Sequence, residues 1–361
     1  MNSTKTNSNI TLVAIFTAMI LLGGRSTPAQ TLDWSATNAA AAAASQRGEN
    51  AVAETLYKQA IDTQKNNLGA DDPAVAVSLN NLAVVYQDQS KYAEAEEAYQ
   101  QALAILQKDD NYQVSAAFTL NNLAALYHDQ GQQDKAVAAY SSALETWKKL
   151  GDAQLANQAN TLISLAGVYH SRTLDAKAEL LYKQVLTLSG DPAMADSPEA
   201  AVAAFHLGEI YRSRSSNEDA ATMYARALSI WANAAQLDTP EAIAAQTALG
   251  EIYRAEGKYS EAEALFSQLL QVQEHKVGTD HLQVAASLNN LALIYYCEGK
   301  YDAAEPLYRQ ALEIREKHLA ATDPLLQQTV QVYATLLRQV GRKAEARKLE
   351  ALALDGTIAH L

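Results

Sequence analysis

The chain has 361 residues, of which 48% are hydrophobic and 19% are charged, which is the composition of a folded protein with a large core and excludes a disordered chain. Its 28 basic and 41 acidic residues give a net charge of −13, which argues against nonspecific binding to nucleic acid or to an anionic membrane. A single cysteine, Cys297, excludes an internal disulfide, and we interpret it as a small filler on a helix.

The first 29 residues have the pattern of an export signal. A basic residue near the start precedes the apolar run Ile10–Leu22, ITLVAIFTAMILL, which is too short to span a bilayer comfortably. The small residues Thr27 and Ala29 then suit cleavage before Gln30. The sequence therefore predicts a signal peptide over residues 1–29 and an exported protein, periplasmic or secreted. The alternative is an uncleaved signal that anchors the protein to a membrane.

From about Leu32 onward, one pattern repeats along the chain. A first series has one step of 41 residues and five steps of 42, and it consists of Tyr86, Tyr127, Tyr169, Tyr211, Tyr253, Tyr295 and Leu337. A second series has its short step in the same interval, and it consists of Tyr57, Tyr99, Tyr140, Tyr182, Tyr224, Phe266 and Tyr308. Both series lose one residue at the same place, so the deletion lies in the loop around Asp109 and Asp110.

A third series supports the same register. Two helices that cross at close range need a small residue at the crossing. Nine residues after each member of the first series stand Ala95, Ala136, Ala178, Ala220, Ala262, Ala304 and Ala346. Extended backward, the register places Ala44 at the tyrosine position and Ala53 and Ala60 at small positions, which predicts an eighth repeat at the start of the array.

Each repeat has the pattern of two amphipathic helices, which we call helix A and helix B. In the first full repeat the buried stripe of helix A comprises Leu79, Leu82, Ala83 and Tyr86, and that of helix B comprises Ala95, Tyr99 and Ala102. Glycines that tolerate positive φ mark several turns between the helices, namely Gly131, Gly257, Gly299 and Gly341. Four prolines that follow Asp, Ser or Thr predict the start of a helix A, namely Pro73, Pro198, Pro240 and Pro324.

The pattern L-x-x-L-A-x-x-Y followed by A-x-x-x-Y resembles the tetratricopeptide repeat (TPR). The period of 42 residues, with LNNLA, GKYDAAEPLYRQALEIREKHL and TDHLQV, resembles the kinesin light chain type of this repeat. The resemblance covers about residues 32–354, so we assign residues 30–355 to the repeat array and 356–361 to a C-terminal tail. The sequence departs from the family pattern in three places. The first repeat lacks large helix A residues, and the third to fifth full repeats lose the Asn-Asn pair. In the last repeat, Glu350 replaces the helix B tyrosine.

The resemblance implies an all-α fold, an α-α superhelix (TPR solenoid) of about eight helical hairpins. It further implies that the A helices line a concave groove that holds peptides or partner proteins. The residues agree, because the positions six and two before the first-series tyrosine and one after it lie on a face turned away from the buried stripe. This face is polar and changes from repeat to repeat, whereas the core face does not.

Side-chain amides on this face can hydrogen-bond an extended peptide backbone. The predicted groove residues are Asn80, Asn81, Gln87, Asn121, Asn122, His128, His170, Arg212, Arg254, Asn289, Asn290 and Tyr296. The amides can equally bond neighbouring helices and tie one repeat to the next. Likewise, the pairs formed by Glu209 with Arg212 and by Glu251 with Arg254 either recognise opposite charges on a ligand or neutralise each other at the i, i+3 spacing.

No catalytic motif is present in the sequence: there is no G-x-S-x-G, no H-E-x-x-H, no phosphate loop and no cysteine pair. His128 and His170 occupy equivalent positions, but two imidazoles without a carboxylate are weak support for a metal. We therefore predict a non-catalytic adaptor or scaffold with no cofactor, no metal and no small-molecule substrate, whose partner is a protein or a peptide. The alternatives are a scaffold that assembles an envelope complex through its convex face or array ends and, third, an enzyme without a recognisable motif.

Overall fold

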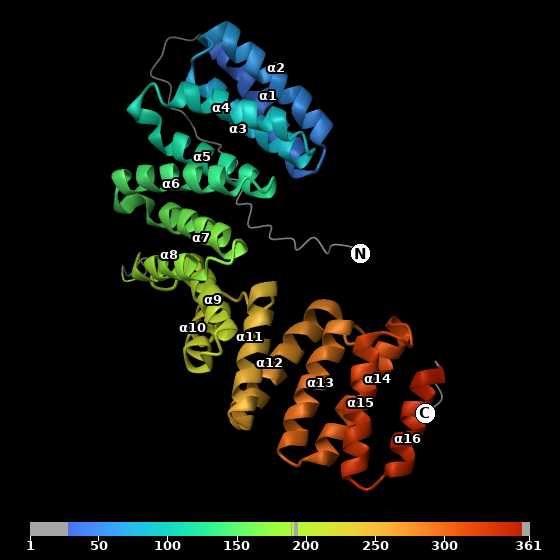
Figure 1. The fold of residues 1–361 in the computed structure, drawn as a ribbon. Coiled ribbons are helices and arrows are strands. Elements are labelled where there is room, and N and C mark those ends of the chain that lie inside the picture. Colours follow the sequence, from blue (N-terminus) through green and yellow to red (C-terminus); the bar gives the residue numbers. More distant parts are fainter. Residues whose placement is uncertain (1–27, 189, 191–193, 356–361) are drawn as a thin grey trace. The chain divides into compact units, whose positions relative to one another are not determined.

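The computed structural model describes residues 28–188, 190 and 194–355, which contain sixteen α-helices and no β-strand (Figure 1). The predicted signal peptide lies outside these residues except for Pro28 and Ala29, which begin the first helix, and so does the tail 356–361. The predicted all-α fold of helical hairpins is confirmed. The chain divides into two compact units, the first ending at Leu188 and the second beginning at Ser189.

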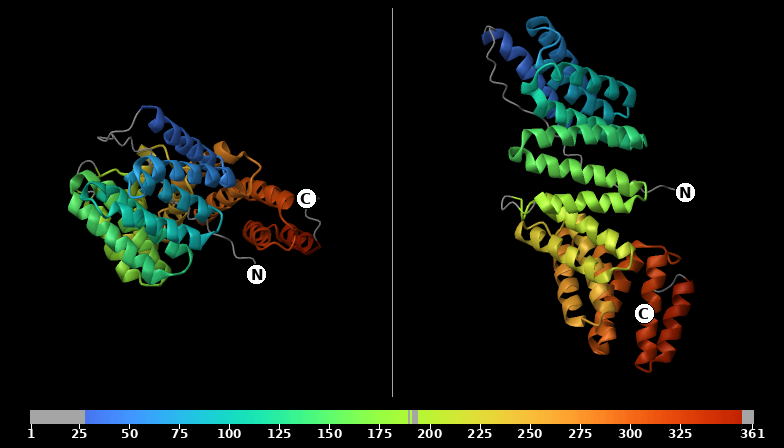
Figure 2. Two further views of the ribbon diagram at one scale, coloured as in Figure 1. Left: turned by 90° about the horizontal axis from the view of Figure 1, so that it is seen from above. Right: turned by 60° about the vertical axis from the view of Figure 1, so that its left-hand side comes forward.

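The first unit contains four helical hairpins. They are formed by α1 (Pro28–Gln46) with α2 (Asn50–Leu68), α3 (Pro73–Asp88) with α4 (Tyr92–Leu106), α5 (Gln113–Asp129) with α6 (Gln133–Leu150), and α7 (Leu155–Ser171) with α8 (Asp175–Leu188). Each helix packs on the next one in the chain, as the successive layers of α5, α6 and α7 show (Figures 1 and 2). Short 3₁₀ turns, Asp110–Tyr112 and Asp152–Gln154, precede α5 and α7.

The second unit repeats this arrangement with four further hairpins. They are formed by α9 (Pro198–Ser213) with α10 (Asn217–Asn233), α11 (Pro240–Ala255) with α12 (Tyr259–Val277), α13 (Leu282–Cys297) with α14 (Tyr301–His318), and α15 (Pro324–Gln339) with α16 (Lys343–Asp355). The helices α13 to α16 lie side by side in sequence order (Figure 1). We number the hairpins 1 to 8 along the chain, with the odd-numbered helix of each as helix A.

The same backbone hydrogen bond closes the turn of every hairpin. The carbonyl of the first-series residue accepts from the N–H five residues later, as in Lys91 N to Tyr86 O and Lys300 N to Tyr295 O, both 2.8 Å. This 6→1 bond belongs to the Schellman motif, which needs a left-handed residue. The predicted glycines fill that position with φ between 72° and 85° in four turns, namely Gly131, Gly257, Gly299 and Gly341. Gly48 fills it in hairpin 1 with φ 75°, and Ser90, Thr173 and Ser215 fill it in the other three turns with φ near 60°.

The four prolines stand at helix starts, as predicted, and each follows a residue whose side chain caps the helix. Asp72 accepts from Ala74 N at 2.8 Å. The other capping residues, Ser197, Thr239 and Asp323, cap α9, α11 and α15 in the same way. Each cap satisfies a backbone N–H that has no partner inside the helix.

The small positions of the register lie in the core. Every alanine nine residues after the first series is fully buried, including the two that define the first and last hairpins: Ala53, Ala95, Ala136, Ala178, Ala220, Ala262, Ala304 and Ala346. The second-series rings are buried against them. In hairpins 5 and 6, Gly208 and Gly250 bring helix A closer still: an added Cβ would lie 2.7 Å from the Tyr224 ring and 2.6 Å from the Phe266 ring.

Candidate interaction face

The predicted groove residues lie on the A helices of six hairpins, α3, α5 and α7 in the first unit and α9, α11 and α13 in the second. They are not uniformly exposed. Asn80 and Asn81 are buried, and so are Val84 and Phe205 at the same repeat positions. His170 and Arg212 are exposed, and the remaining predicted groove residues are half-buried. The expectation that this whole face turns away from the core is therefore wrong for the buried positions.

Hydrogen bonds connect asparagines on neighbouring A helices. Asn122 Nδ2 donates to the buried Asn80 Oδ1 at 3.1 Å, across hairpins 2 and 3. The Asn121 amide donates to Thr161 Oγ1 at 2.9 Å, across hairpins 3 and 4. The same contact recurs in the second unit, where Asn289 Nδ2 donates to Thr329 Oγ1 at 2.8 Å. These amides tie one hairpin to the next, which is one of the two roles that the sequence left open. Peptide binding by the asparagines stays a prediction, and the Oδ1 atom of Asn289 is buried with no partner.

The hydroxyl partners of these amides were missed in the sequence, although their pattern is visible there. The position eight residues before the first-series residue is Ser or Thr in Ser78, Thr119, Thr161, Ser287 and Thr329. It is alanine in the remaining hairpins, and two of these alanines, Ala203 and Ala245, stand 40 residues after the apolar Ile163 and Phe205. A polar residue on one hairpin is thus matched by a polar residue on the next. A comparison of positions 40 residues apart would have found this.

The residues one position after the tyrosine face the start of their own helix B. His128 Nδ1 lies 2.9 Å from Gln133 Oε1, and His170 Nδ1 lies 2.8 Å from Asp175 Oδ1. In hairpin 7 the Tyr296 ring lies against the Tyr301 ring, with centroids 5.6 Å apart. Gln87 instead donates from Nε2 to Asp129 Oδ2 on the next hairpin, at 2.8 Å. These positions therefore form short polar or aromatic contacts near the turns of hairpins 2, 3, 4 and 7.

The two Glu-Arg pairs have different environments. Glu209 and Arg212 form an ion pair of 3.1 Å, and the Tyr224 hydroxyl also donates to Glu209. That pair neutralises itself, and hydrogen bonding to Glu209 raises the pKa of Arg212. By contrast, Glu251 and Arg254 form no ion pair in the part of the chain that the structure describes.

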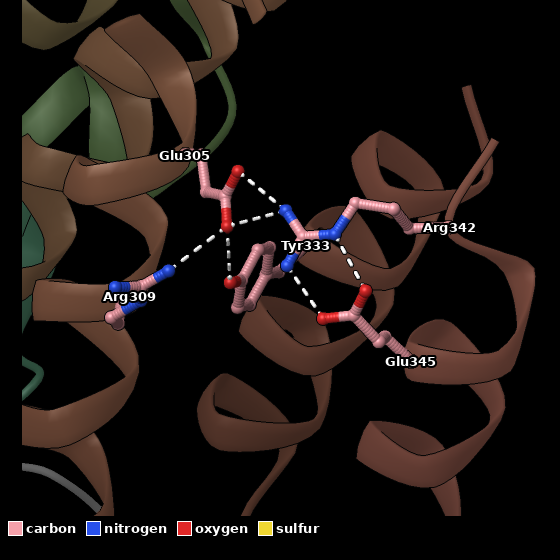
Figure 3. Close-up of polar contacts among 5 residues, drawn as sticks. All are labelled: Glu305, Arg309, Tyr333, Arg342 and Glu345. Carbon is pink, nitrogen blue, oxygen red and sulfur yellow. Dashed lines mark hydrogen bonds and ion pairs between the residues drawn. The ribbon is translucent and has the colours of Figure 1, made fainter. Parts of the chain in front are cut away.

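The tyrosine hydroxyls of helix A bind glutamates of the preceding helix B. Tyr127 donates to Glu96 at 2.8 Å, and Tyr295 donates to Glu263 at 2.9 Å. At the C-terminal end, Glu305 accepts from Tyr333 at 3.2 Å (Figure 3). Sequence reasoning missed these ties as well, because it placed the tyrosines in the core without assigning a partner to their hydroxyls.

Glu305 is the centre of the most extended of these contacts. Arg342 contacts both of its carboxylate oxygens at 2.8 Å, while Arg309 lies 2.9 Å away and Glu345 binds the other side of Arg342 (Figure 3). Burial by itself raises the pKa of Glu305, but the hydrogen bonds and charge of Arg342 outweigh it, so that the pKa is lowered. The contacts of Glu305 with Arg342 and Tyr333 therefore join hairpins 7 and 8.

Two further features of the described residues bear on the class of protein. They contain no group of three or more His, Cys, Asp or Glu side chains with the geometry of a metal site. None of the helices among them combines the length and apolarity needed to cross a membrane. Cys297 is a free, half-buried cysteine near the end of α13.

Comparison with known proteins agrees with this architecture. The tetratricopeptide repeat family matches residues 34–108, 115–190 and 241–317, more than half of the chain. No curated protein sequence matches significantly. Many solved structures do.

Two of these structures share the fold. The C-terminal part of a TPR repeat-containing protein from Cytophaga hutchinsonii has a TM-score of 0.55 at 12% identity, over 80% of this chain and 97% of that one. The apo form of the quorum sensor NprR from B. thuringiensis has a TM-score of 0.52 at 13% identity, over 92% and 89%. The kinesin light chain TPR-like repeats of Podospora anserina match at 23% identity, over 56% and 96%, with a TM-score of 0.46.

Proposed function

Because the chain belongs to the tetratricopeptide repeat family, whose members are generally non-catalytic interaction scaffolds, we propose that it is an exported adaptor that binds an extended segment of a partner protein along its A helices. The observation that carries the proposal is a contrast within each hairpin. The crossing alanines are the same in all eight hairpins, whereas the polar positions of helix A change from one hairpin to the next. A surface that varies over a constant core is what recognition of a particular segment requires.

The residues best suited to contact a partner are those not already used between hairpins. Asn121 and Asn289 donate to the next hairpin, so their replacement would also loosen the array. His170 is exposed, and Arg254, Asn290 and Tyr296 are half-buried. Arg212 is exposed but already neutralised by Glu209, so we leave it out of this set. Binding at these positions costs the fold little, and the affinity expected of such reversible contacts is on the micromolar scale, about 1 μM.

Affinity capture tests this proposal. Mature protein, residues 30–361, is used to capture proteins of the organism's envelope and culture medium, beside a variant with Asn290→Ala, Arg254→Ala and Tyr296→Ala. The control variant carries Gln310→Ala and Glu313→Ala on the exposed side of α14. We expect a partner to be retained by parent and control and lost by the groove variant, with equal melting temperatures for all three. Equal retention by all three would rule out the A-helix face.

Export is tested separately. We expect the protein in the envelope fraction or the medium to begin at Gln30, as N-terminal sequencing would establish. A protein that stays inside the cell with an intact N-terminus would contradict export and would leave the binding proposal unaffected.

One observation supports an alternative in which the chain acts as a scaffold through a different surface. Leu174 and Leu180, beside and within α8, are 37% and 59% exposed and lie outside the A helices. In that case, Leu174→Ser with Leu180→Ser would abolish partner retention, and the groove variant would keep it.

A further inference from the structure

Hairpins 5 and 6 contain the same sequence, GEIYR, but its glutamate and arginine make different contacts in the two hairpins. In hairpin 5, Arg212 is held by Glu209 at 3.1 Å. In hairpin 6, Glu251 is exposed, Arg254 is half-buried, and no ion pair joins either to another described residue. The identical pentapeptide removes local sequence as the cause, so the difference must come from what packs against it.

The difference lies in the ring that helix B presents. Tyr224 packs over Gly208, and its hydroxyl donates to Glu209, which holds that carboxylate beside Arg212. The corresponding ring in hairpin 6 is Phe266, which packs over Gly250 at the same close range but has no hydroxyl. Glu251 therefore lacks the donor that orients its counterpart.

The loss of one oxygen atom leaves two opposite charges free on the A-helix face. Glu251 and Arg254 are three residues apart on α11, so their Cα atoms lie roughly 5 Å apart along the helix surface. Arg254 is partly removed from water without a counter-charge, which makes a carboxylate a favourable neighbour for it. The adjacent hairpin contributes Asn290 and Tyr296, both half-buried, at predicted groove positions.

We propose that Glu251 and Arg254 form the charged part of the partner site, and that they bind an extended segment carrying one basic and one acidic side chain two positions apart. This inference rests on the proposed function and specifies its ligand. An extended chain advances about 3.3 Å per residue and its side chains alternate between two faces, so side chains two positions apart point the same way and lie about 6.6 Å apart, close to the separation of the two charges. The Glu209–Arg212 pair has no such role because its charges are already satisfied.

The net charge of the protein favours this occupant over a segment of one sign. A purely acidic segment would approach against the net charge of −13, and a purely basic one would leave Arg254 without a partner. A segment that carries one basic and one acidic side chain avoids both the repulsion and the unpaired Arg254. A segment with the two charges in the opposite order would place like charges together.

Selection from a phage-displayed library of random linear peptides tests the proposal with the full mature chain, residues 30–361. The variants are Glu251→Gln with Arg254→Gln, the charge swap Glu251→Arg with Arg254→Glu, and the matched control Glu209→Gln with Arg212→Gln. We expect parent and control to enrich peptides with a closely spaced basic and acidic residue. The neutral variant should lose that enrichment, and the swap should enrich the two charges in the opposite order.

The outcomes separate this inference from the proposed function. Peptides that bind through Asn290 and Tyr296 but show no paired charges would overturn the inference and leave the adaptor function standing. If parent protein enriches no peptide at all, both fail, because both require this face to bind a linear segment.

A single-atom change gives a second test on one selected peptide. Phe266→Tyr restores the hydroxyl, which should donate to Glu251, draw it toward Arg254 and weaken peptide binding about two- to fivefold, as measured by fluorescence polarisation. The control variant Tyr140→Phe removes the hydroxyl of a buried second-series ring in hairpin 3, which contains neither charged pair, and should leave the affinity unchanged. If the Phe266→Tyr protein has the parent melting temperature and binds the peptide with unchanged affinity, the role assigned to Glu251 and Arg254 is contradicted.

Discussion

At the scale of single residues, the size of one side chain decides whether a hairpin can close. Ala220 is fully buried where α9 and α10 cross. We expect Ala220→Phe to lower the free energy of unfolding by about 1 to 3 kcal/mol, because the added ring must displace packed neighbours. Denaturant unfolding measures this, with Ala232→Phe on the exposed side of the same helix as control. Equal midpoints for the two variants would show that the register is wrong.

Replacing a buried amide in hairpin 6 with an apolar side chain is expected to raise the free energy of unfolding. Gln246 is fully buried in α11, its Oε1 atom has no partner, and its Nε2 atom reaches only Gln268 Oε1 at 3.4 Å. The same position is leucine in Leu79, Leu120, Leu162 and Leu288. Gln246→Leu should therefore raise the free energy of unfolding by about 1 to 2 kcal/mol. The exposed control Gln271→Leu should change it by less than about 0.5 kcal/mol, and a destabilised Gln246→Leu protein would refute the argument.

The sequence predicted those residues that the local backbone conformation requires. It did not predict residues whose conformation or contacts depend on a neighbouring hairpin. The turn glycines and capping residues were predictable because local geometry requires them. The turn residues Ser90, Thr173 and Ser215 were not, because φ near 60° disfavours them and only the surrounding hairpin enforces it. In the candidate site, the polar positions were found, but the partners of Asn121 and Asn289 belong to the next hairpin and have no local signature.

At the scale of helices, glutamates near the start of helix B connect successive hairpins. Glu54 in α2 binds Lys58 on its own helix and Lys91 of hairpin 2, each at 2.7 Å. The tie formed by Glu305 joins hairpins 7 and 8 in the same manner (Figure 3). Such contacts supplement the apolar packing between neighbours, on which a repeat array mainly depends.

The Glu54 tie predicts a defined dependence on pH. Hydrogen bonds from Lys58, and then from Lys91, lower the pKa of Glu54 to about 2. A carboxylate with a lowered folded-state pKa stabilises the fold above its unfolded pKa, about 4.3, and loses that contribution as the pH falls through the folded value. Because the Lys58 and Lys91 side chains are 52% and 41% exposed, water screens both contacts, and Glu54→Gln should lower the free energy of unfolding by only about 0.5 to 1 kcal/mol at pH 7.

The difference between the Glu54→Gln protein and the parent should shrink as the pH falls from about 4.3 to about 2. Denaturant midpoints measured across this range provide the test. The exposed Glu145→Gln variant controls for the general effect of removing one negative charge. A difference that stays constant with pH would show that the lysine contacts do not stabilise the fold.

At the scale of the whole molecule, stability is expected to be local, because within each compact unit every hairpin packs on its immediate neighbours. Hydrogen exchange of the Ala220→Phe protein should speed up in α9 to α12 and stay at the parent rate in α15 and α16. Uniformly faster exchange throughout the second unit would instead indicate one cooperative block. The division at Leu188 was not predictable, since the repeat register runs through that point without a break.

The hydrogen bond that closes every turn has a consequence for the gene. Its donor and acceptor are five residues apart in all eight hairpins, so one codon inserted within a turn would misplace the donor. Recombination that adds or removes a whole block of 42 codons keeps every turn intact. The single shortened step falls between hairpins, in the loop after α4, where no such bond fixes the length. The coding sequence can thus lengthen or shorten in steps of one hairpin, and finer changes are confined to the connections between hairpins.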